Sequence, residues 1–91
     1  MKKSVYKKLV KEVTKLENKY YLSPYNWTES MFAISKKLDI SFKIGSDIKS
    51  LEDEVDSIYT ACFEDIEVYF YTKVGFGGGV KTIKIIISEN N

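Results

Sequence analysis

The chain has 91 residues, of which 44% are hydrophobic and 30% charged, and its net charge is +1, which is the composition of one ordinary globular domain. It contains no histidine and a single cysteine, Cys62, so Ser-His-Asp and Cys-His catalysis, histidine-ligated zinc and an internal disulfide are excluded. We therefore expect one domain over residues 1–91 that is not an enzyme and has no catalytic residue, bound metal or cofactor.

The basic residues indicate the kinds of partner to expect. All fourteen are lysine, and because arginine is the usual residue for bidentate contacts with phosphate and guanine, sequence-specific recognition of nucleic acid is disfavoured. Charge is also divided along the chain. Residues 1–44 carry ten lysines and four acidic residues, a net charge of +6, whereas residues 45–91 carry four lysines and nine acidic residues, a net charge of −5. Either the two halves neutralise each other inside the domain, or the surface is dipolar and one pole meets a partner.

No membrane association is predicted. No segment approaches the roughly 18 to 20 consecutive apolar residues of a membrane span, and Lys2 and Lys3 are followed by a polar, alternating pattern instead of an apolar signal core. A lone cysteine agrees with a reducing compartment. We expect a cytoplasmic protein.

Two amphipathic helices are predicted in the first half of the chain. Apolar residues recur at steps of three and four from residue 5 to residue 20, which predicts a helix that ends near Tyr21, before Pro24. A capping box of Asn26 and Glu29 predicts the start of a second helix, whose apolar positions continue to residue 38.

The period changes to two after the second helix. Residues 40–44 alternate as in a half-buried strand that Gly45 stops. Residues 46–57 combine helical apolar spacing with an acidic cluster that also suits a solvated loop, and we predict a short helix there. Residues 58–63 are rich in strand-forming side chains and are predicted as a strand, although one longer helix through both segments fits the same spacing.

The C-terminal segment predicts a hairpin. Residues 66–74 alternate strictly, and residues 80–88 form a second strand in which Ile83, Ile85 and Ile87 should share the buried face. Residues 75–79, four of them glycine, connect the two strands. The predicted fold class is α+β, with two N-terminal helices packed on a three- or four-stranded antiparallel sheet that ends in a long β-hairpin. A long apolar edge strand at residues 80–88 would also allow a homodimer by pairing with its copy.

The glycine loop is similar to a phosphate-binding loop, but the match fails where the chemistry needs it. Residues 75–82 read GFGGGVKT, with Val80 in place of the glycine that wraps phosphate, and a strand follows instead of a helix. The loop instead places Phe76 between glycines, where a large apolar ring either contacts a partner or folds back on the sheet.

Two tyrosines and an acidic cluster complete the candidate partner-binding surface. Tyr69 and Tyr71 fall on the polar face of residues 66–74; nearby carboxylates argue against base stacking on RNA and favour cross-strand pairs or anchors for another protein. The predicted partner-binding residues are Phe76, Tyr69, Tyr71, Glu52, Asp53, Glu54 and Asp56.

An alternative function uses the first predicted helix. Lys8, Lys11, Lys15 and Lys19 share its polar face and would bind DNA or RNA weakly and without sequence preference. Solvation of a charged helix face explains the same pattern.

In size, lysine-rich composition and helix-plus-sheet outline, the whole chain resembles the small proteins that bacteriophages and mobile elements encode to block host machinery, of which anti-CRISPR proteins are one group. Its near-neutral charge departs from the strongly acidic DNA mimics among them. The resemblance implies a non-catalytic inhibitor in the host cytoplasm that occupies the surface of a larger host protein, such as a nucleic-acid enzyme.

Overall fold

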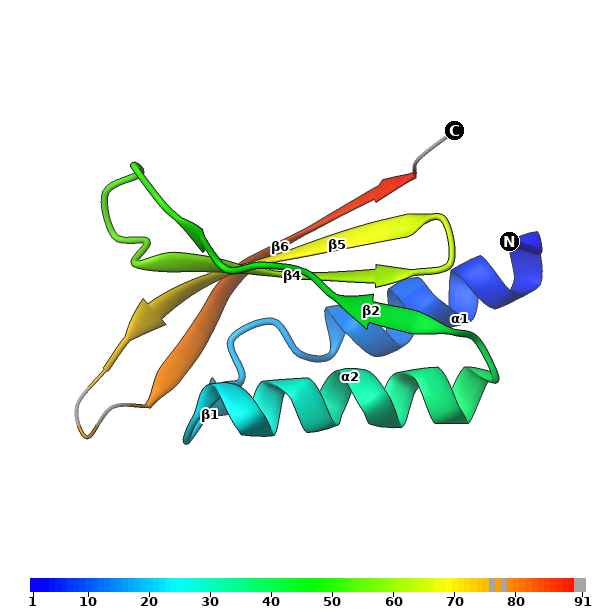
Figure 1. The fold of residues 1–91 in the computed structure, drawn as a ribbon, viewed down its shortest axis with the longest axis horizontal. Helices are drawn as coiled ribbons and strands as arrows, with labels where there is room; N and C mark the ends of the chain where they lie inside the picture. The colour runs from blue at the N-terminus through cyan, green and yellow to red at the C-terminus, as the bar shows by residue number, and fades with distance from the viewer. Residues whose placement is uncertain (76, 78, 90–91) are drawn as a thin grey trace.

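The computed structural model describes residues 1–75, 77 and 79–89, which form two helices and one antiparallel sheet of six strands. The elements in chain order are α1 (Lys3–Thr14), β1 (Tyr20–Tyr21), α2 (Pro24–Leu38), β2 (Phe42–Ile44), β3 (Ile48–Lys49), β4 (Ser57–Phe63), β5 (Ile66–Val74) and β6 (Val80–Glu89). The strand order is β1-β6-β5-β4-β2, and β3 pairs with β4 further along the edge that β2 occupies (Figure 1). The fold is therefore α+β, with more strands than the three or four that the sequence predicts.

The first helix is shorter than predicted. It ends at Thr14, and the chain then turns through Asn18, whose φ of 66° is left-handed. The Asn18 amide donates to the Thr82 carbonyl at 2.7 Å, and the Thr82 amide donates to the Lys19 carbonyl at 3.0 Å. The prediction of a helix to Tyr21 is wrong, because β6 binds this segment as a short strand instead.

The second helix begins two residues before the predicted capping box. Ser23 is extended and Pro24 is the first helical residue, where its missing N–H costs nothing. The helix ends at Leu38, after which Asp39 adopts a left-handed φ of 53°. It buries Trp27, Met31 and Ile34.

The predicted helix over residues 46–57 is also wrong. Ile48 pairs with Ile58 and Lys49 with Ser57, so part of the segment forms β3 along the edge of β4. The Asp56 amide then donates to the Thr72 carbonyl at 2.8 Å, which holds the end of the segment on β5. These bonds to strands that follow in the sequence replace the bonds that a helix would make.

The two longest strands contain an irregularity that changes which residues are buried. Tyr71 pairs with Lys84 while Thr72 pairs with Thr82, so Ile83 is the extra residue of a bulge. Ile85 and Ile87 pack against the core as expected. Ile83 is half-buried and lies outside the core cluster, so its predicted place is wrong.

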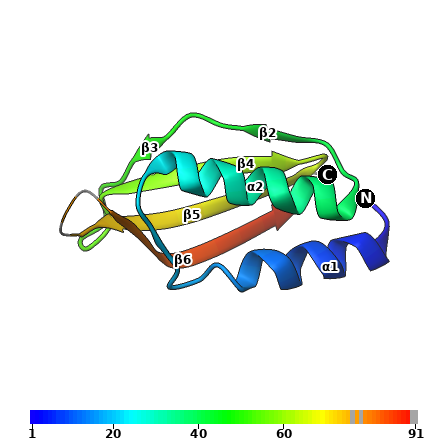
Figure 2. The same cartoon turned by 90° about the horizontal axis from the view of Figure 1, so that it is seen from below.

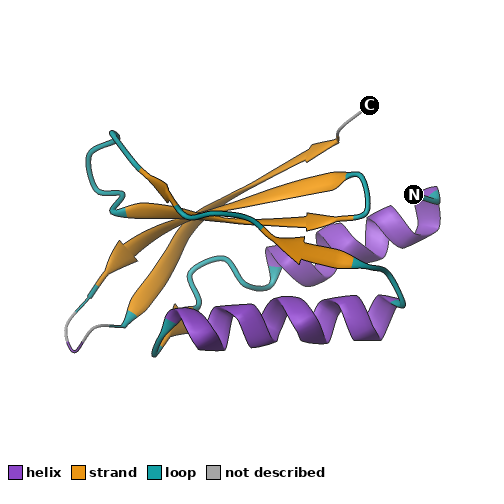
Figure 3. Cartoon of the chain, viewed as in Figure 1, coloured by secondary structure: helices purple, strands orange, loops and turns teal. Residues whose placement is uncertain are grey.

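The core lies between the helices and one face of the sheet (Figures 1 and 2). Its largest members are Trp27, Tyr21, Phe63 and Phe70. The short strands β1, β2 and β3 lie at the margins of the sheet (Figure 3), and Figure 2 shows α1 running alongside β6. In the described part of the chain, neither helix is long and apolar enough to cross a bilayer.

Candidate partner-binding surface

The face of the sheet opposite the helices, which we call the open face, carries the alternate residues that the core does not use. The pairing register of β3, β4, β5 and β6 determines which side chains lie on the open face, and all of these side chains are partly or fully exposed. They are Ile48, Ile58, Thr60, Cys62, Glu67, Tyr69, Tyr71, Lys84 and Ile86. Ile48 is 47% exposed and Ile86 is 40% exposed. No described helix covers this face, since both helices lie on the other side of the sheet (Figure 1).

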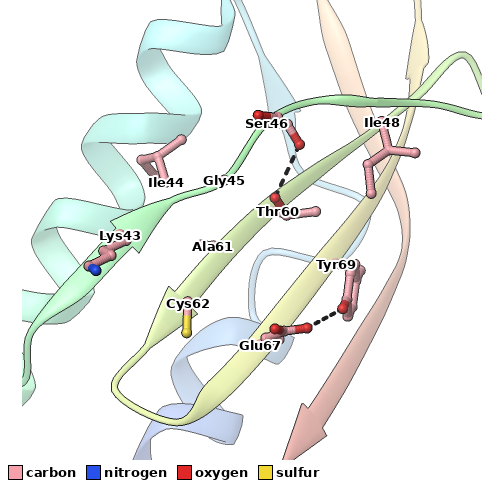
Figure 4. Close-up of a pocket in the computed structure, with 10 residues that line it drawn as sticks. All are labelled: Lys43, Ile44, Gly45, Ser46, Ile48, Thr60, Ala61, Cys62, Glu67 and Tyr69. Carbon is pink, nitrogen blue, oxygen red and sulfur yellow. Dashed lines mark hydrogen bonds between the residues drawn. The ribbon is translucent and has the colours of Figure 1, made fainter. Parts of the chain in front are cut away.

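A hollow of about 480 Å³ opens on this face, where the chain passes from β2 to β3 (Figure 4). Its lining includes Ile44 and Ile48 at the rim, with Cys62 and Tyr69 across from them. The volume is within the range of sites that take a small ligand or an anchoring side chain. The rim is close to β4 because the Gly45 amide donates to the Thr60 carbonyl at 2.9 Å. A Cβ on Gly45 would lie 2.1 Å from Thr60 Oγ1, so a side chain at this position would require Thr60 to move.

Polar groups of the hollow are held by local hydrogen bonds. Thr60 Oγ1 donates to the Ser46 carbonyl at 3.2 Å, and the Tyr69 hydroxyl donates to the Glu67 carboxylate (Figure 4). The bond to Glu67 stabilises the protonated phenol and raises the pKa of Tyr69. The Tyr69 side chain therefore lines the hollow in its neutral form, and its hydrogen bond to Glu67 fixes the position of the ring.

Tyr71 lies further along the same face and connects to the acidic segment. Lys84 Nζ lies 4.4 Å from the Tyr71 ring centroid, a cation–π distance, and 3.8 Å from a Glu52 carboxylate oxygen. The structure therefore brings two of the predicted residues, Tyr71 and Glu52, to one lysine.

The rest of the acidic segment folds against the strands. Glu54 forms an ion pair with Lys73 at 2.5 Å, which lowers the pKa of the Glu54 carboxyl and raises the pKa of the Lys73 ammonium. Asp56 Oδ2 accepts a hydrogen bond from the Val74 amide at 2.6 Å. Asp53 is exposed. Phe76, the remaining predicted contact, lies outside the described residues.

The four lysines predicted to bind nucleic acid, Lys8, Lys11, Lys15 and Lys19, do not all lie on one helix in the structure. Lys8 and Lys11 are exposed on α1 and Lys15 is its C-cap residue. Lys15 forms an ion pair with Glu12 at 3.1 Å, Lys37 also pairs with Glu12, and both lysines lower the pKa of that carboxyl. Lys19 follows the helix, with its Nζ 5.6 Å from the Tyr21 ring centroid. The single lysine face predicted for one long helix is therefore interrupted.

The open face offers a partner apolar contact, charged groups and hydrogen bonds. The Cys62 thiol is half-buried and donates to the Glu64 carbonyl at 3.1 Å. Within the described ranges, no three carboxylate, cysteine or histidine side chains are grouped as metal ligands would be. The sequence predicts that Tyr69 and Tyr71 lie on this face, whereas its only local signal for the hollow is Gly45 after a strand.

Comparison of the chain with protein-family models, with curated proteins and with solved structures finds no match.

Proposed function

We propose that this protein acts by binding a larger protein through the open face of its sheet. The observation that carries the proposal is an uncovered sheet face on which tyrosines and exposed isoleucines lie beside a hollow of about 480 Å³. Contiguous exposed apolar groups rimmed by polar ones are typical of protein-binding surfaces.

The tyrosines suit this role because they add contact area at little conformational cost. Tyr69 is held by Glu67 and Tyr71 by the cation–π contact with Lys84, so neither ring loses much freedom when a partner covers it. Rigid aromatic anchors of this kind dominate the energies of many interfaces. An apolar side chain of the partner would enter the hollow beside Tyr69.

Charge supports a basic surface on the partner. The acidic segment from Glu52 to Asp56 lies next to Tyr71, and its lysine contacts leave it with a negative excess. A groove that normally holds nucleic acid is basic, so it would be attracted to this end of the molecule. The partner we propose is therefore a host nucleic-acid enzyme, and the consequence of binding is inhibition.

The test is capture of the partner followed by a matched pair of variants. Tagged protein is expressed in the host cell, and a partner that purifies with it in a fixed ratio is identified and assayed for inhibition. We expect Ile86→Asp to abolish capture and inhibition, because it places a charge on the open face at an exposed position. Leu22→Asp, which changes an 82% exposed residue between β1 and α2, should leave both intact.

Two results would contradict the proposal. One is a partner that binds Ile86→Asp as tightly as it binds the unaltered protein. The other is inhibition of the partner that persists when the open face carries the new charge. Circular dichroism of both variants checks that they fold.

A further inference from the structure

A second surface, separate from the open face, lies at the outer edge of β2. This strand pairs with β4 on one side only. The Ser41 carbonyl accepts from the Glu64 amide at 3.1 Å, and the Gly45 amide donates to the Thr60 carbonyl at 2.9 Å. Residues 41, 43 and 45 therefore direct their backbone groups toward β4.

Because backbone direction alternates along a strand, Phe42 and Ile44 direct their N–H and C=O groups away from β4. No hydrogen bond joins these four groups to another residue in the part of the chain that the structure describes. They form an open hydrogen-bonding edge, which in many proteins is covered or blocked.

A groove with an aromatic centre and polar ends, which we call the α2–β2 groove, accompanies this edge. Phe32 is 60% exposed on α2, and its ring meets that of Phe42 edge to face at 6.1 Å. A hollow of about 450 Å³ lies on one side of Phe32 and includes Tyr25 and Glu29. Another of about 460 Å³ lies on its other side, where Ser41 lines it together with the charged residues Lys36 and Asp39.

We propose that an extended segment of a partner protein adds to β2 as a further strand and lays its alternate side chains in the α2–β2 groove. The free groups of Phe42 and Ile44 define this occupant, since only another extended backbone offers donors and acceptors at the matching spacing. Side chains two residues apart on one face of a strand lie about 6.4 to 6.8 Å apart. One apolar side chain can therefore cover Phe32 while its neighbours on the same face reach toward the two hollows.

Charge specifies one end of the segment. Glu29 lines the hollow beside Tyr25, and its carboxylate interacts with the Tyr25 hydroxyl, which raises the pKa of that phenol. Glu29 forms no ion pair with any residue in the described ranges. A lysine or arginine of the added segment would form an ion pair with Glu29. We therefore expect a segment in which every second residue is apolar and a basic residue lies at the Tyr25 end.

The experiment selects random twelve-residue peptides, displayed on phage, against the whole folded protein, and then measures the synthetic peptides by fluorescence anisotropy. Enriched peptides should alternate apolar residues and carry a basic residue. Phe32→Ser, at an exposed position, should weaken binding at least ten-fold, and Glu29→Lys should weaken it several-fold. Ile86→Asp is the matched control on the open face and should leave the affinity unchanged.

A second measurement reports the strand itself. Two peptide series are N-methylated at every second residue, one at the odd and one at the even positions. The series that methylates the amides facing β2 should lose binding, and the other should bind as the unmodified peptide does. On binding, the Phe42 and Ile44 amides should also become protected from hydrogen exchange. Selection of no peptide, unchanged affinity for Phe32→Ser, or no alternation in the N-methylation series would overturn the inference. A dimer of the protein that Phe32→Ser dissociates would also overturn it, since a second copy would then be the occupant.

Discussion

Trp27 lies at the centre of the core and contacts two strands at once. Its ring meets those of Tyr59 and Phe70 edge to face, with centroids 5.1 and 5.4 Å apart, and its side chain is almost fully buried. We expect Trp27→Ala to reduce the free energy of unfolding by about 3 to 5 kcal/mol, since it removes these contacts and leaves a cavity. Urea denaturation measures the loss. Trp27→Phe should cost less, because the indole N–H has no hydrogen-bond partner among the described residues; an equal cost would contradict this account.

Because the Tyr21 hydroxyl is buried, we expect the protein to become less stable at alkaline pH. The Tyr21 side chain is 2% exposed, and desolvation raises its pKa from the ordinary value of 10.0 to about 12, although the Ser30 and Thr82 hydroxyls nearby offset part of the rise. A raised pKa means that the folded state favours the neutral phenol. This contribution to stability is complete below pH 10 and is lost as the pH rises through 12.

Tyr21→Phe tests this dependence. The Tyr21 hydroxyl makes no hydrogen bond within the described ranges, so at pH 7 the substitution should change stability by less than about 1 kcal/mol. Between pH 10 and 12 the variant should become the more stable protein, as thermal unfolding across that range would show. A difference that does not vary with pH would be inconsistent with a phenol that ionises only on unfolding.

At the scale of elements, the strand ends beside the glycine loop are organised by one aromatic ring. A Cβ on Gly79 would lie 2.2 Å from Tyr20 Cε1, and a Cβ on Gly75 would lie 1.9 Å from the Tyr20 hydroxyl. The ring of β1 therefore occupies the space that these two glycines leave at the ends of β5 and β6. The Gly75 amide also donates to the Gly79 carbonyl at 2.8 Å.

Gly79→Ala should therefore destabilise the protein, but by less than the roughly 1 to 3 kcal/mol that overpacking costs in a core, because the Tyr20 ring is 48% exposed and can shift. Most of that cost should disappear when Tyr20 is also replaced by alanine, because the clash is with its ring. A double-mutant cycle in urea measures the coupling. Additive effects of the two substitutions would show that the ring and the loop are independent.

The lysines of α1 predict weak binding of nucleic acid at most. Lys8 and Lys11 remain exposed, whereas Lys15 shares Glu12 with Lys37. If the alternative function holds, a gel shift with single- or double-stranded DNA should appear at low salt, weaken steeply as salt rises and disappear in Lys8→Glu/Lys11→Glu. Absence of a shift at low salt would end that alternative.

At the scale of the whole molecule, charge is only partly segregated, since Asp65 and Glu89 of the acidic half lie with Met1 and Lys3 around one hollow at the start of α1. Ion pairs of Glu12, Glu52 and Glu54 each join residues of the same half of the chain, while the Met1 amino group pairs with Asp65 of the other half at 3.6 Å. Of the two alternatives, neutralisation of one half of the chain by the other is therefore carried by one of these pairs only. In Figure 1, α1 and the acidic loop before β4 lie toward opposite ends of a molecule 39 Å long.

This arrangement predicts retention on both cation and anion exchangers at pH 7.5 and low salt, despite a net charge of +1. The molecule is 39 Å long, which exceeds the Debye length of about 30 Å at 0.01 M salt, so each end contacts a resin largely independently of the other. Elution volumes on the two columns check this. Passage of the protein through either column without retention would mean that the charges cancel at short range.

Local patterns determine the parts of this fold that are long or strictly periodic. The alternation of residues 66–74 predicts β5 and places Tyr69 and Tyr71 opposite the core, because a strand with one buried face cannot shift by one residue without exposing that face. The apolar spacing of α2 predicts the burial of Trp27, Met31 and Ile34 in the same way.

Tertiary pairing decides the rest. Residues 15–21 and 46–57 have helical spacing, yet hydrogen bonds to β6, β4 and β5 hold them in other conformations. The bulge at Ile83, the hollow beside Gly45 and the free edge of β2 likewise exist only once distant segments meet. The amino-acid sequence by itself determined the two longest strands, the second helix and the faces that β5 and α2 bury. Short segments were left to the tertiary structure, because a few residues gain too little from local contacts to resist pairing with a strand that is already formed.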